Sequence, residues 1–265
     1  MHTAPTVSVV IPVRDDEELL RRCLTALAAQ RRAPDEIVVV DNGSTDGSAD
    51  VASAAGARVV AEPEPGIPAA SARGFDEARG EVIARLDADC VPPADWIERI
   101  RDAFADDPAL DALTGPARFI DGPRALRPLL STLYVGSYVV AVAPALGHVP
   151  LFGSNLAVRR EAWAEVRERV HRRDALMHDD MDLSMHLGPC RRFRYDLRLG
   201  MGISMRALRG GGRLRLRRGV HSIVSHWPDQ FPVRRWGRRA AWLASGAVAV
   251  RSVDDPGIER RSRPT

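Results

Sequence analysis

The sequence contains no lysine, and all 38 of its basic residues are arginines. A genome rich in G and C would explain this bias, but a planar guanidinium group also suits phosphate better than an ammonium group does. Because 35 acidic residues oppose the arginines, the net charge is only +3. This charge is too small to indicate a nucleic-acid-binding protein, so we expect no nucleic-acid partner.

Cysteine is also scarce, and the three that occur are far apart in the chain. Cys23, Cys90 and Cys190 are odd in number and show no metal-ligand spacing. We therefore expect a reducing compartment and no structural disulfide. The N-terminus lacks the basic and apolar pattern of a secretion signal. Together these absences predict a cytoplasmic protein.

Long uncharged runs are rare, and the exception is residues 129–147, nineteen residues without a charged side chain. This stretch contains serine, threonine, glycine, proline and two tyrosines, so it is polar for a membrane-spanning helix. We expect a buried or membrane-facing helix instead. Ten arginines between residues 191 and 218 could add contact with the inner face of the cell membrane, close over a diphosphate, or form solvated surface.

The first part of the chain alternates short β-branched runs with helical periodicity. Strands are expected at 7–12, 36–41, 58–61 and 82–86, and helices at 19–27, 69–78 and 94–104. This order predicts an α/β fold with a mostly parallel central sheet flanked by helices. The pattern loosens after residue 111, with strands expected at 113–119 and 156–159 and helices at 160–170 and 230–250. One domain over 1–253 and a frayed tail over 254–265 are expected.

Two carboxylates end the strand at 82–86. Asp87 and Asp89 lie at its carboxyl end, where open α/β sheets bind ligands. Residues i and i+2 of an extended segment point to the same side, so the two charges repel unless something positive lies between them. A divalent cation, Mg²⁺ or Mn²⁺, would do this and would hold a substrate diphosphate. The alternative is a polar turn after the strand.

Three strands of the predicted sheet end in polar or acidic segments, at Pro12, Asp41 and Asp87. If these ends meet in one crevice, Asp41 is placed to accept the imide proton of a uracil-like base. Arg73 could contact the base or the diphosphate. Asp87 suits a ribose hydroxyl or the metal, and Asp89 suits the metal.

These segments together resemble the family 2 glycosyltransferases of GT-A fold. The similarity is carried by Val7–Glu18, Ile37–Gly47, Gly66 with Ser71–Arg73, and Leu86–Cys90, so it is close over residues 7–105 and looser over 150–190. It implies a nucleotide-sugar-binding half at 7–118 and a mixed acceptor-binding half at 119–253. It also implies a nucleotide pocket and an Asp-x-Asp metal site for Mn²⁺ or Mg²⁺ at Asp87 and Asp89. The implied nucleotide-binding residues are Pro12, Val13, Glu17, Asp41, Arg73 and Asp87.

The resemblance extends to two segments of the second half. Phe152–Arg160 is similar to the family's acceptor-side segment, which implies acceptor binding by Gly153, Ser154 and Asn155. Met177–Leu183 is similar to its Glu-Asp-x-Asp-Leu motif, with Asp179 in place of glutamate at the acceptor. Asp180 would then be the general base of an inverting enzyme, since a sugar hydroxyl must lose its proton as it attacks. Without the resemblance, Asp179, Asp180 and Asp182 would be interpreted as acidic residues in the first turn of a helix.

The sequence departs from the family pattern at residues expected to contact the nucleobase and at a signature of processive enzymes. Val13 and Arg14 follow Pro12 where an aromatic residue is common. Arg235–Trp236 keeps part of a processive signature without its glutamine, so we expect one sugar per encounter. His221, expected in a loop with His226, is a candidate third metal ligand by analogy with some GT-A enzymes.

The function implied by the resemblance is metal-assisted transfer of a sugar from a nucleotide-diphospho-sugar, with UDP favoured, to a hydroxyl acceptor. A role in envelope polysaccharide or glycolipid synthesis fits this activity. A catalytically silent sugar-nucleotide-binding protein is the main alternative. A nucleotidyltransferase or a dinucleotide oxidoreductase is disfavoured because no glycine precedes Gly43, which excludes a glycine-rich loop after the first strand.

Overall fold

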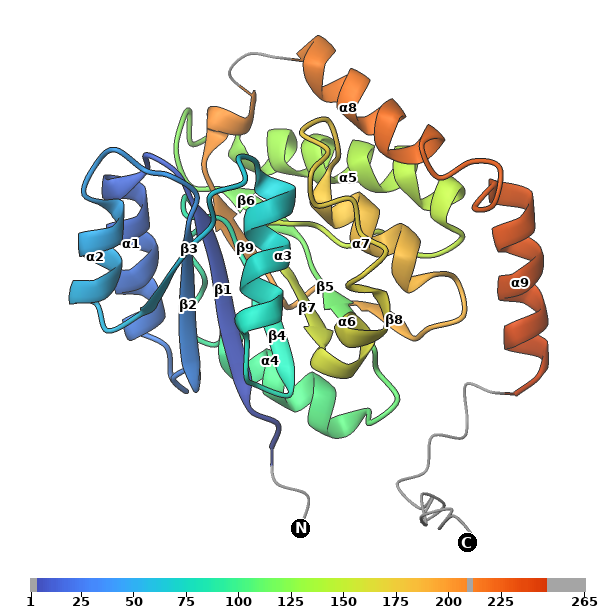
Figure 1. The fold of residues 1–265 in the computed structure, drawn as a ribbon, viewed down its shortest axis with the longest axis horizontal. Coiled ribbons are helices and arrows are strands. Elements are labelled where there is room, and N and C mark those ends of the chain that lie inside the picture. The colour runs from blue at the N-terminus through green and yellow to red at the C-terminus, as the bar shows by residue number, and fades with distance from the viewer. Residues whose placement is uncertain (1–3, 209–211, 247–265) are drawn as a thin grey trace, which may run out of the picture.

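The computed structural model describes residues 4–208 and 212–246, and it confirms the α/β class (Figure 1). A seven-stranded sheet has the order β3-β2-β1-β4-β7-β5-β8. Strands β1 (Val7–Val13), β2 (Glu36–Asp41), β3 (Arg58–Ala61) and β4 (Val82–Arg85) are parallel to one another. Strand β7 (Leu156–Arg159) runs antiparallel to β4 and thereby joins the two halves of the chain in one sheet.

Helices cover both faces of the parallel strands because β1 is apolar on both sides. One face packs against α1 (Glu17–Ala28), α2 (Ser48–Ala54) and α4 (Trp96–Asp106). The other face packs against α3 (Ile67–Glu77), α6 (Arg160–Val166) and α7 (Asp179–Leu187). Val9 and Ile11 point into the first core and Val10 into the second, as period-two alternation requires.

The strand expected at 113–119 is two strands. Strand β5 (Ala112–Thr114) pairs with β7 and with β8 (Phe193–Tyr195), whereas β6 (Ala117–Phe119) pairs with β9 (Met201–Ile203) in a second sheet. Gly115 and Pro116 separate them. A side chain at Gly115 would lie 2.2 Å from the carbonyl oxygen of Leu199, so the backbone passes too close to another segment for the strand to continue.

The uncharged stretch forms α5 (Arg127–Leu146), which packs along β6. The chain then closes with a short 3₁₀ helix, η1 (Met205–Leu208), followed by α8 (Gly212–Val224) and α9 (Pro232–Ala244). His221 therefore lies in a helix, and the prediction of a loop at this residue was wrong. The helix expected at 160–170 ends at Val166. The helix expected at 230–250 spans only Pro232–Ala244, and the expected tail at 254–265 lies outside the described residues.

Candidate functional site

The carboxyl ends of β1, β2 and β4 border a crevice at one edge of the sheet, since all three strands run in the same direction. Its lining consists of Pro12, Val13, Arg14, Asp16, Asn42, Ile67, Ala70, Asp87, Ala88, Asp89 and Arg206. Four of the residues predicted from the sequence to bind nucleotide or metal therefore lie together there: Pro12, Val13, Asp87 and Asp89.

Arg206 of η1 closes one side of this crevice. Its Nε atom donates to Asp89 Oδ2 over 2.7 Å, and its two Nη atoms donate to Asp16 over 2.6 and 2.5 Å. Burial raises the pKa of Asp89, and so does the negative charge of Asp87, while Arg206 acts in the opposite direction. Arg206 thus connects the C-terminal half of the chain to the first and fourth strands.

Asp87 is held by two groups from different elements. Its Oδ1 atom lies 2.8 Å from Nη2 of Arg85, and its Oδ2 atom accepts a hydrogen bond of 2.6 Å from Ser154 Oγ. Because Asp87 pairs with Arg85 and Asp89 pairs with Arg206, their proximity does not by itself require a metal ion. This corrects the expectation that only a bound cation could reconcile the two charges.

The donor set nevertheless fits a hard divalent cation. Carboxylate oxygens of Asp87 and Asp89 and the sulfur of Cys90 lie within 4.8 Å of one another. Burial raises the pKa of the Cys90 thiol, so the sulfur stays protonated and the two carboxylates are the available ligands. Arg206 already supplies a positive charge at Asp89, which indicates that the position favours a cation. Oxygen ligands suit Mg²⁺ or Mn²⁺.

Two further carboxylates begin α7 on the other side of Arg85. Asp179 accepts a hydrogen bond of 2.7 Å from Ser71 Oγ on α3 and lies 3.3 Å from Nη2 of Arg85. Asp180 accepts a hydrogen bond of 2.9 Å from the backbone N–H of Gly153. The side chain of Arg85, which is 3% exposed, thus lies between the carboxylates at the end of β4 and those at the start of α7.

The surroundings of Asp180 make its carboxyl group more basic than usual. Burial raises the pKa of Asp180, and the charge of Asp179 raises it further, whereas the Gly153 N–H and Arg85 lower it. A carboxylate with a raised pKa is a better proton acceptor near neutral pH. The environment therefore suits Asp180 to general base catalysis.

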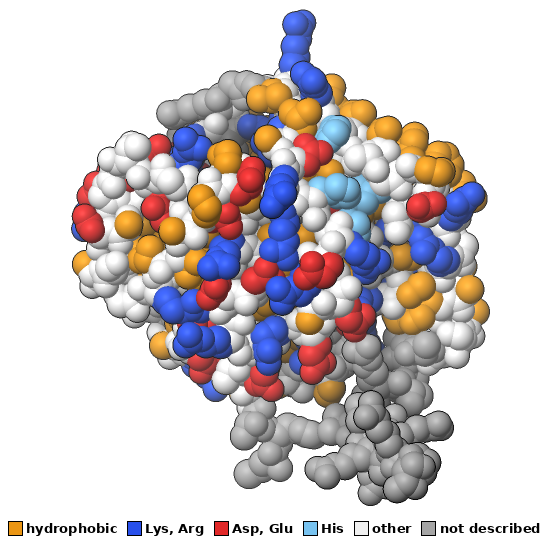
Figure 2. All heavy atoms as spheres, viewed as in Figure 1, with side chains coloured by type: hydrophobic (Ala, Val, Ile, Leu, Met, Phe, Trp, Pro, Cys, Tyr) orange, Lys and Arg blue, Asp and Glu red, His pale blue; other side chains and the backbone are white. Residues whose placement is uncertain are grey.

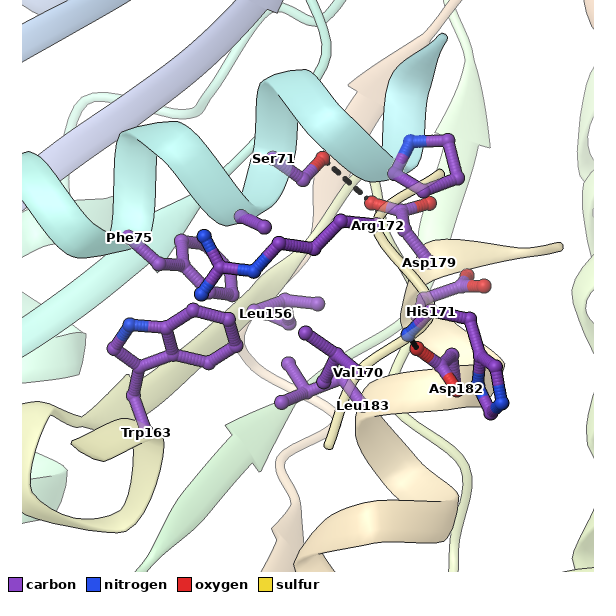
Figure 3. A pocket seen from close by; sticks show the side chains of 13 residues that line it. Ser71, Phe75, Leu156, Trp163, Val170, His171, Arg172, Asp179, Asp182 and Leu183 are labelled. Carbon is purple, nitrogen blue, oxygen red and sulfur yellow. Dashed lines mark hydrogen bonds and ion pairs between the residues drawn. The ribbon is translucent and has the colours of Figure 1, made fainter. Parts of the chain in front are cut away.

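A cavity lies beside these acids, between α3, α6 and α7 (Figure 3). Ser71 and Phe75 point into it from α3, Trp163 from α6, and Asp179 and Leu183 from α7. The cavity is mixed in character, with rings on one side and carboxylates on the other. Its volume is only about 20 Å³, and Asp179 and Asp180 both belong to its lining.

The predicted acceptor segment has roles that differ from residue to residue. A side chain at Gly153 would lie 2.1 Å from Nη1 of Arg85, so only glycine allows the arginine this position. Ser154 orients Asp87. Asn155 is fully buried, accepts from Trp96 Nε1 and donates to the carbonyl oxygens of Pro116 and Leu199. Its amide is fully used by these hydrogen bonds, so Asn155 stabilises the structure around the site and does not contact the sugar acceptor.

Three predicted nucleotide-binding residues lie at the periphery. Asp41 accepts a hydrogen bond from the backbone N–H of Ser44 at the end of β2. Glu17 pairs with Arg21 one turn along α1. Arg73 pairs with Glu77 over 3.1 Å on the half-exposed side of α3. Asp41, Glu17 and Arg73 are absent from the lining of the crevice.

His221 does not join Asp87 and Asp89. Its Nε2 atom lies 2.6 Å from Asp174 Oδ2, and within the described residues the metal-ligating groups near the two aspartates are theirs and Cys90. The structure therefore does not bring together the predicted third ligand and the Asp-x-Asp pair. The reason is that His221 lies on α8, whose neighbouring helix is α7.

Sequence reasoning missed Arg85, Asp16 and Ser71. Arg85 left a signal, since a charged residue within a strand of otherwise apolar side chains must find partners when it is buried. Asp16 and Ser71 lie in segments that carry the family resemblance, Val7–Glu18 and Ser71–Arg73, but no role was assigned to them because an acid before a helix and a serine within one are common. Arg206 belonged to the arginine-rich segment, but nothing local distinguished it from its neighbours.

Residues 8–166, more than half of the chain, match the model of the sequence family called Glycosyl transferase family 2. The glycosyltransferase AglE of Haloferax volcanii is 35% identical over 105 residues, which are 37% of this chain and 34% of that protein. An undecaprenyl-phosphate 4-deoxy-4-formamido-L-arabinose transferase of Pseudomonas aeruginosa is 42% identical over 105 residues, 36% of this chain and 31% of that one. The chain thus spans about a third of the length of these relatives.

Solved structures extend the similarity to most of the chain. A mannosyltransferase of Pyrobaculum calidifontis, in complex with GDP-Man and Mn²⁺, has a TM-score of 0.58 at 19% identity. The aligned region covers 94% of this chain and 76% of the mannosyltransferase chain. Glucosyl-3-phosphoglycerate synthase of Mycobacterium tuberculosis, in complex with Mn²⁺, UDP-glucose and phosphoglyceric acid, has a TM-score of 0.58 at 22% identity. The aligned region covers 83% of this chain and 79% of the synthase chain. At these identities the match concerns the fold, which is the expected GT-A fold.

Proposed function

The chain belongs to glycosyltransferase family 2, and on that basis we propose that it transfers a sugar from a nucleotide-diphospho-sugar, with UDP as the nucleotide, to an acceptor hydroxyl with inversion at C1. The observation that carries this proposal is the position of Arg85 between two pairs of carboxylates, Asp87 with Asp89 and Asp179 with Asp180. One pair faces the crevice at the carboxyl edge of the sheet, and the other faces the cavity beside α7.

In the proposed reaction, Asp180 accepts the proton of the acceptor hydroxyl while the hydroxyl oxygen forms a bond to C1 of the sugar. The bond between C1 and the phosphate oxygen breaks, and the nucleoside diphosphate leaves with that electron pair. The Gly153 N–H holds one oxygen of Asp180 in place, and Asp179 keeps its pKa high. A positioned base of this kind contributes about 10²–10⁴-fold to the rate.

For the donor, we assign the crevice lined by Pro12, Val13 and Asp87 to the nucleotide. Asp87 and Asp89 would hold Mn²⁺ or Mg²⁺, which offsets the charge that develops on the departing diphosphate. The Mn²⁺ that accompanies a nucleotide sugar in the two fold neighbours supports this choice. Arg206 and Arg14, which line the same crevice, supply further positive charge.

We also propose that the protein works in contact with a membrane surface. Among the described residues, α5 is the one helix whose length and apolarity would allow it to cross a membrane, and 22% of its most apolar window is buried. Leu129, Leu133 and Val140 of α5 are 57%, 58% and 75% exposed. Figure 2 shows hydrophobic side chains along the upper and right-hand rim, where Figure 1 places α8 and α9.

Two features support a lipid-linked acceptor on this surface. Exposed Leu214 and Leu216 alternate with arginines on α8, so apolar insertion and attraction to anionic headgroups would act together. The name of the Pseudomonas relative, an undecaprenyl-phosphate 4-deoxy-4-formamido-L-arabinose transferase, includes a lipid phosphate. Flotation with vesicles that contain anionic lipid tests the contact; protein that stays at the bottom of the gradient at low salt contradicts it.

The activity itself is tested by release of UDP from UDP-sugars with Mn²⁺ in the presence of candidate acceptors. We expect Asp89→Ala and Asp180→Asn each to abolish release while the circular dichroism spectrum and melting temperature stay near those of the wild type. Asp106→Asn, an exposed acid on α4, is the matched control and keeps full activity. Full turnover by Asp180→Asn would overturn the assignment of the base, and GDP-sugar turnover without UDP-sugar turnover would overturn that of the nucleotide.

A further inference from the structure

Three histidines surround one buried aspartate of α7, Asp182. Asp182 and His186 come from α7, His171 from the segment after α6, and His226 from the segment after α8. The ring centroids of the three histidines are 5.0 to 5.4 Å apart, so the rings form a nearly regular triangle. Figure 2 shows histidine side chains gathered below α8, and Figure 3 shows His171 beside Asp182.

All three rings direct a nitrogen at the same oxygen. Asp182 Oδ1 lies 2.7 Å from His171 Nδ1, 3.0 Å from His226 Nε2 and 3.2 Å from His186 Nε2. The other oxygen, Oδ2, accepts the backbone N–H of His171 over 2.7 Å. His186 Nε2 is buried and makes no hydrogen bond of acceptable geometry, so three ring nitrogens crowd one oxygen and one of them is left without a hydrogen bond.

The hydrogen bond of the other ring nitrogen of His226 shows a second conflict between the ring and Asp182. His226 Nδ1 lies 2.8 Å from the carbonyl oxygen of Ser222, which can only accept, so Nδ1 carries the proton. In a neutral ring the Nε2 atom then presents a lone pair to Asp182, an acceptor facing an acceptor. The side chains of His226 and Asp182 are 2% and 3% exposed, so water does not relieve this contact. A ring that donates one nitrogen to a carbonyl and points the other at a shared centre is the arrangement found around metal ions.

We propose that His171, Asp182, His186 and His226 bind one divalent transition-metal ion of the zinc class. Three imidazoles and one carboxylate make a complete tetrahedral set. With metal–ligand bonds of about 2.0–2.1 Å, tetrahedral ligand atoms lie about 3.4 Å apart. The observed contacts of 2.7, 3.0 and 3.2 Å would need to widen by about 0.7, 0.4 and 0.2 Å to reach this spacing. The ring of His171, 38% exposed, provides the route of entry.

The proposed ion is structural, because four protein ligands leave no open position for a substrate. It would tie the ends of two segments to α7, whose first turn carries Asp179 and Asp180. Without it, α8 meets α7 through contacts such as the hydrogen bond from the His178 N–H to Ser222 Oγ. The site is independent of the Asp-x-Asp pair, and it stands whether or not the proposed glycosyl transfer is correct.

The experiment measures metal bound to the full chain. Protein is stripped with a chelator, incubated with ZnCl₂, dialysed and analysed by elemental mass spectrometry. We expect one zinc per chain in the wild type and in Asp89→Ala, and loss of that zinc in the double variant His186→Gln/His226→Gln. His221→Gln, which removes a histidine of α8 outside the cluster, is the matched control and keeps its zinc.

If the double variant unfolds, two measurements on stripped wild-type protein, its melting temperature and its absorption with cobalt, still test the proposal. Stripped wild-type protein should melt at a lower temperature and recover when zinc is added, in wild type and in Asp89→Ala alike. Cobalt added to stripped protein should give the intense visible absorption of tetrahedral Co²⁺. Stripped wild-type protein that takes up no zinc, or zinc uptake that disappears in Asp89→Ala, overturns the proposal and leaves the cluster as a hydrogen-bonded network.

Discussion

The Nη2 atom of Arg85 lies 2.8 Å from the Oδ1 atom of Asp87, two residues along the same chain. Burial opposes the charged form of Arg85, but Asp179 and Asp87 outweigh it and raise the pKa of the guanidinium group. One buried cation therefore organises carboxylates from β4 and from α7, which lie far apart in the sequence.

Replacement of Arg85 should destabilise the protein strongly. In Arg85→Met, the half-buried carboxylates of Asp87 and Asp179 lose the buried cation that they share, so we expect a loss of up to about 3–5 kcal/mol in the free energy of unfolding. Urea denaturation measures it. Arg73→Met, which breaks a half-exposed pair with Glu77, should cost less than about 1 kcal/mol. Equal losses in both variants would contradict the central role of Arg85.

A methyl group at residue 153 should disturb the same arginine. In Gly153→Ala the new carbon would lie 2.1 Å from Nη1 of Arg85, and the displaced side chain should cost about 1–3 kcal/mol. We also expect UDP release to fall, because the Gly153 N–H orients Asp180. Gly136→Ala on α5 meets no atom within 4 Å and should be neutral or slightly stabilising. Thermal melts of the two variants provide the comparison.

The pH dependence of activity should follow Asp180. Burial and the charge of Asp179 raise its pKa above the usual 3.8, so the base becomes active only as pH rises through that higher value. In Asp179→Asn the neighbouring charge is gone, and the acid limb of kcat/KM should move to lower pH. The limb in Asp106→Asn should not move. An unshifted limb in Asp179→Asn would show that another group governs it.

The same shift has a consequence for stability. The folded chain holds the proton of Asp180 more tightly than the unfolded chain does. The free energy of unfolding contributed by this group therefore falls as pH rises from the unfolded pKa through the raised folded pKa. Asp180→Asn removes this titrating carboxyl, so it should lessen this loss. Urea denaturation of wild type and variant at several pH values, at fixed ionic strength, measures the difference.

Loss of Arg206 should strengthen metal binding in the absence of nucleotide. Arg206→Ala removes the cation that competes for Asp89, so we expect the Kd for Mn²⁺ to fall by about tenfold, or ~1.4 kcal/mol. Titration followed by electron paramagnetic resonance of free Mn²⁺ measures this. Arg14→Ala is the control, since Arg14 lines the same crevice but pairs with Asp15 at 3.9 Å. Weaker Mn²⁺ binding in Arg206→Ala would show that the arginine does not compete.

The local pattern of the sequence was sufficient for the parallel half of the sheet. The strands at 36–41 and 58–61 begin and end at the expected residues, because β-branched runs between turn residues have few other stable conformations. Asp87 and Asp89 follow the strand at 82–86 directly, so their place at its carboxyl end followed from their position in the chain. The split at Gly115 could not be foreseen, since its cause is the carbonyl group of Leu199.

The sequence by itself determined the fold class, the family and the edge of the sheet where the first two acids gather, because each depends on residues that are close together in the chain. Only the tertiary structure decided which charges meet. The partners of Asp89 and Asp87 are Arg206 and Ser154, which lie 117 and 67 residues away, and the histidines around Asp182 come from three separate segments. Local propensity contains no information about such pairs, since they form only when the apolar faces of distant elements pack together and bring their polar groups within reach.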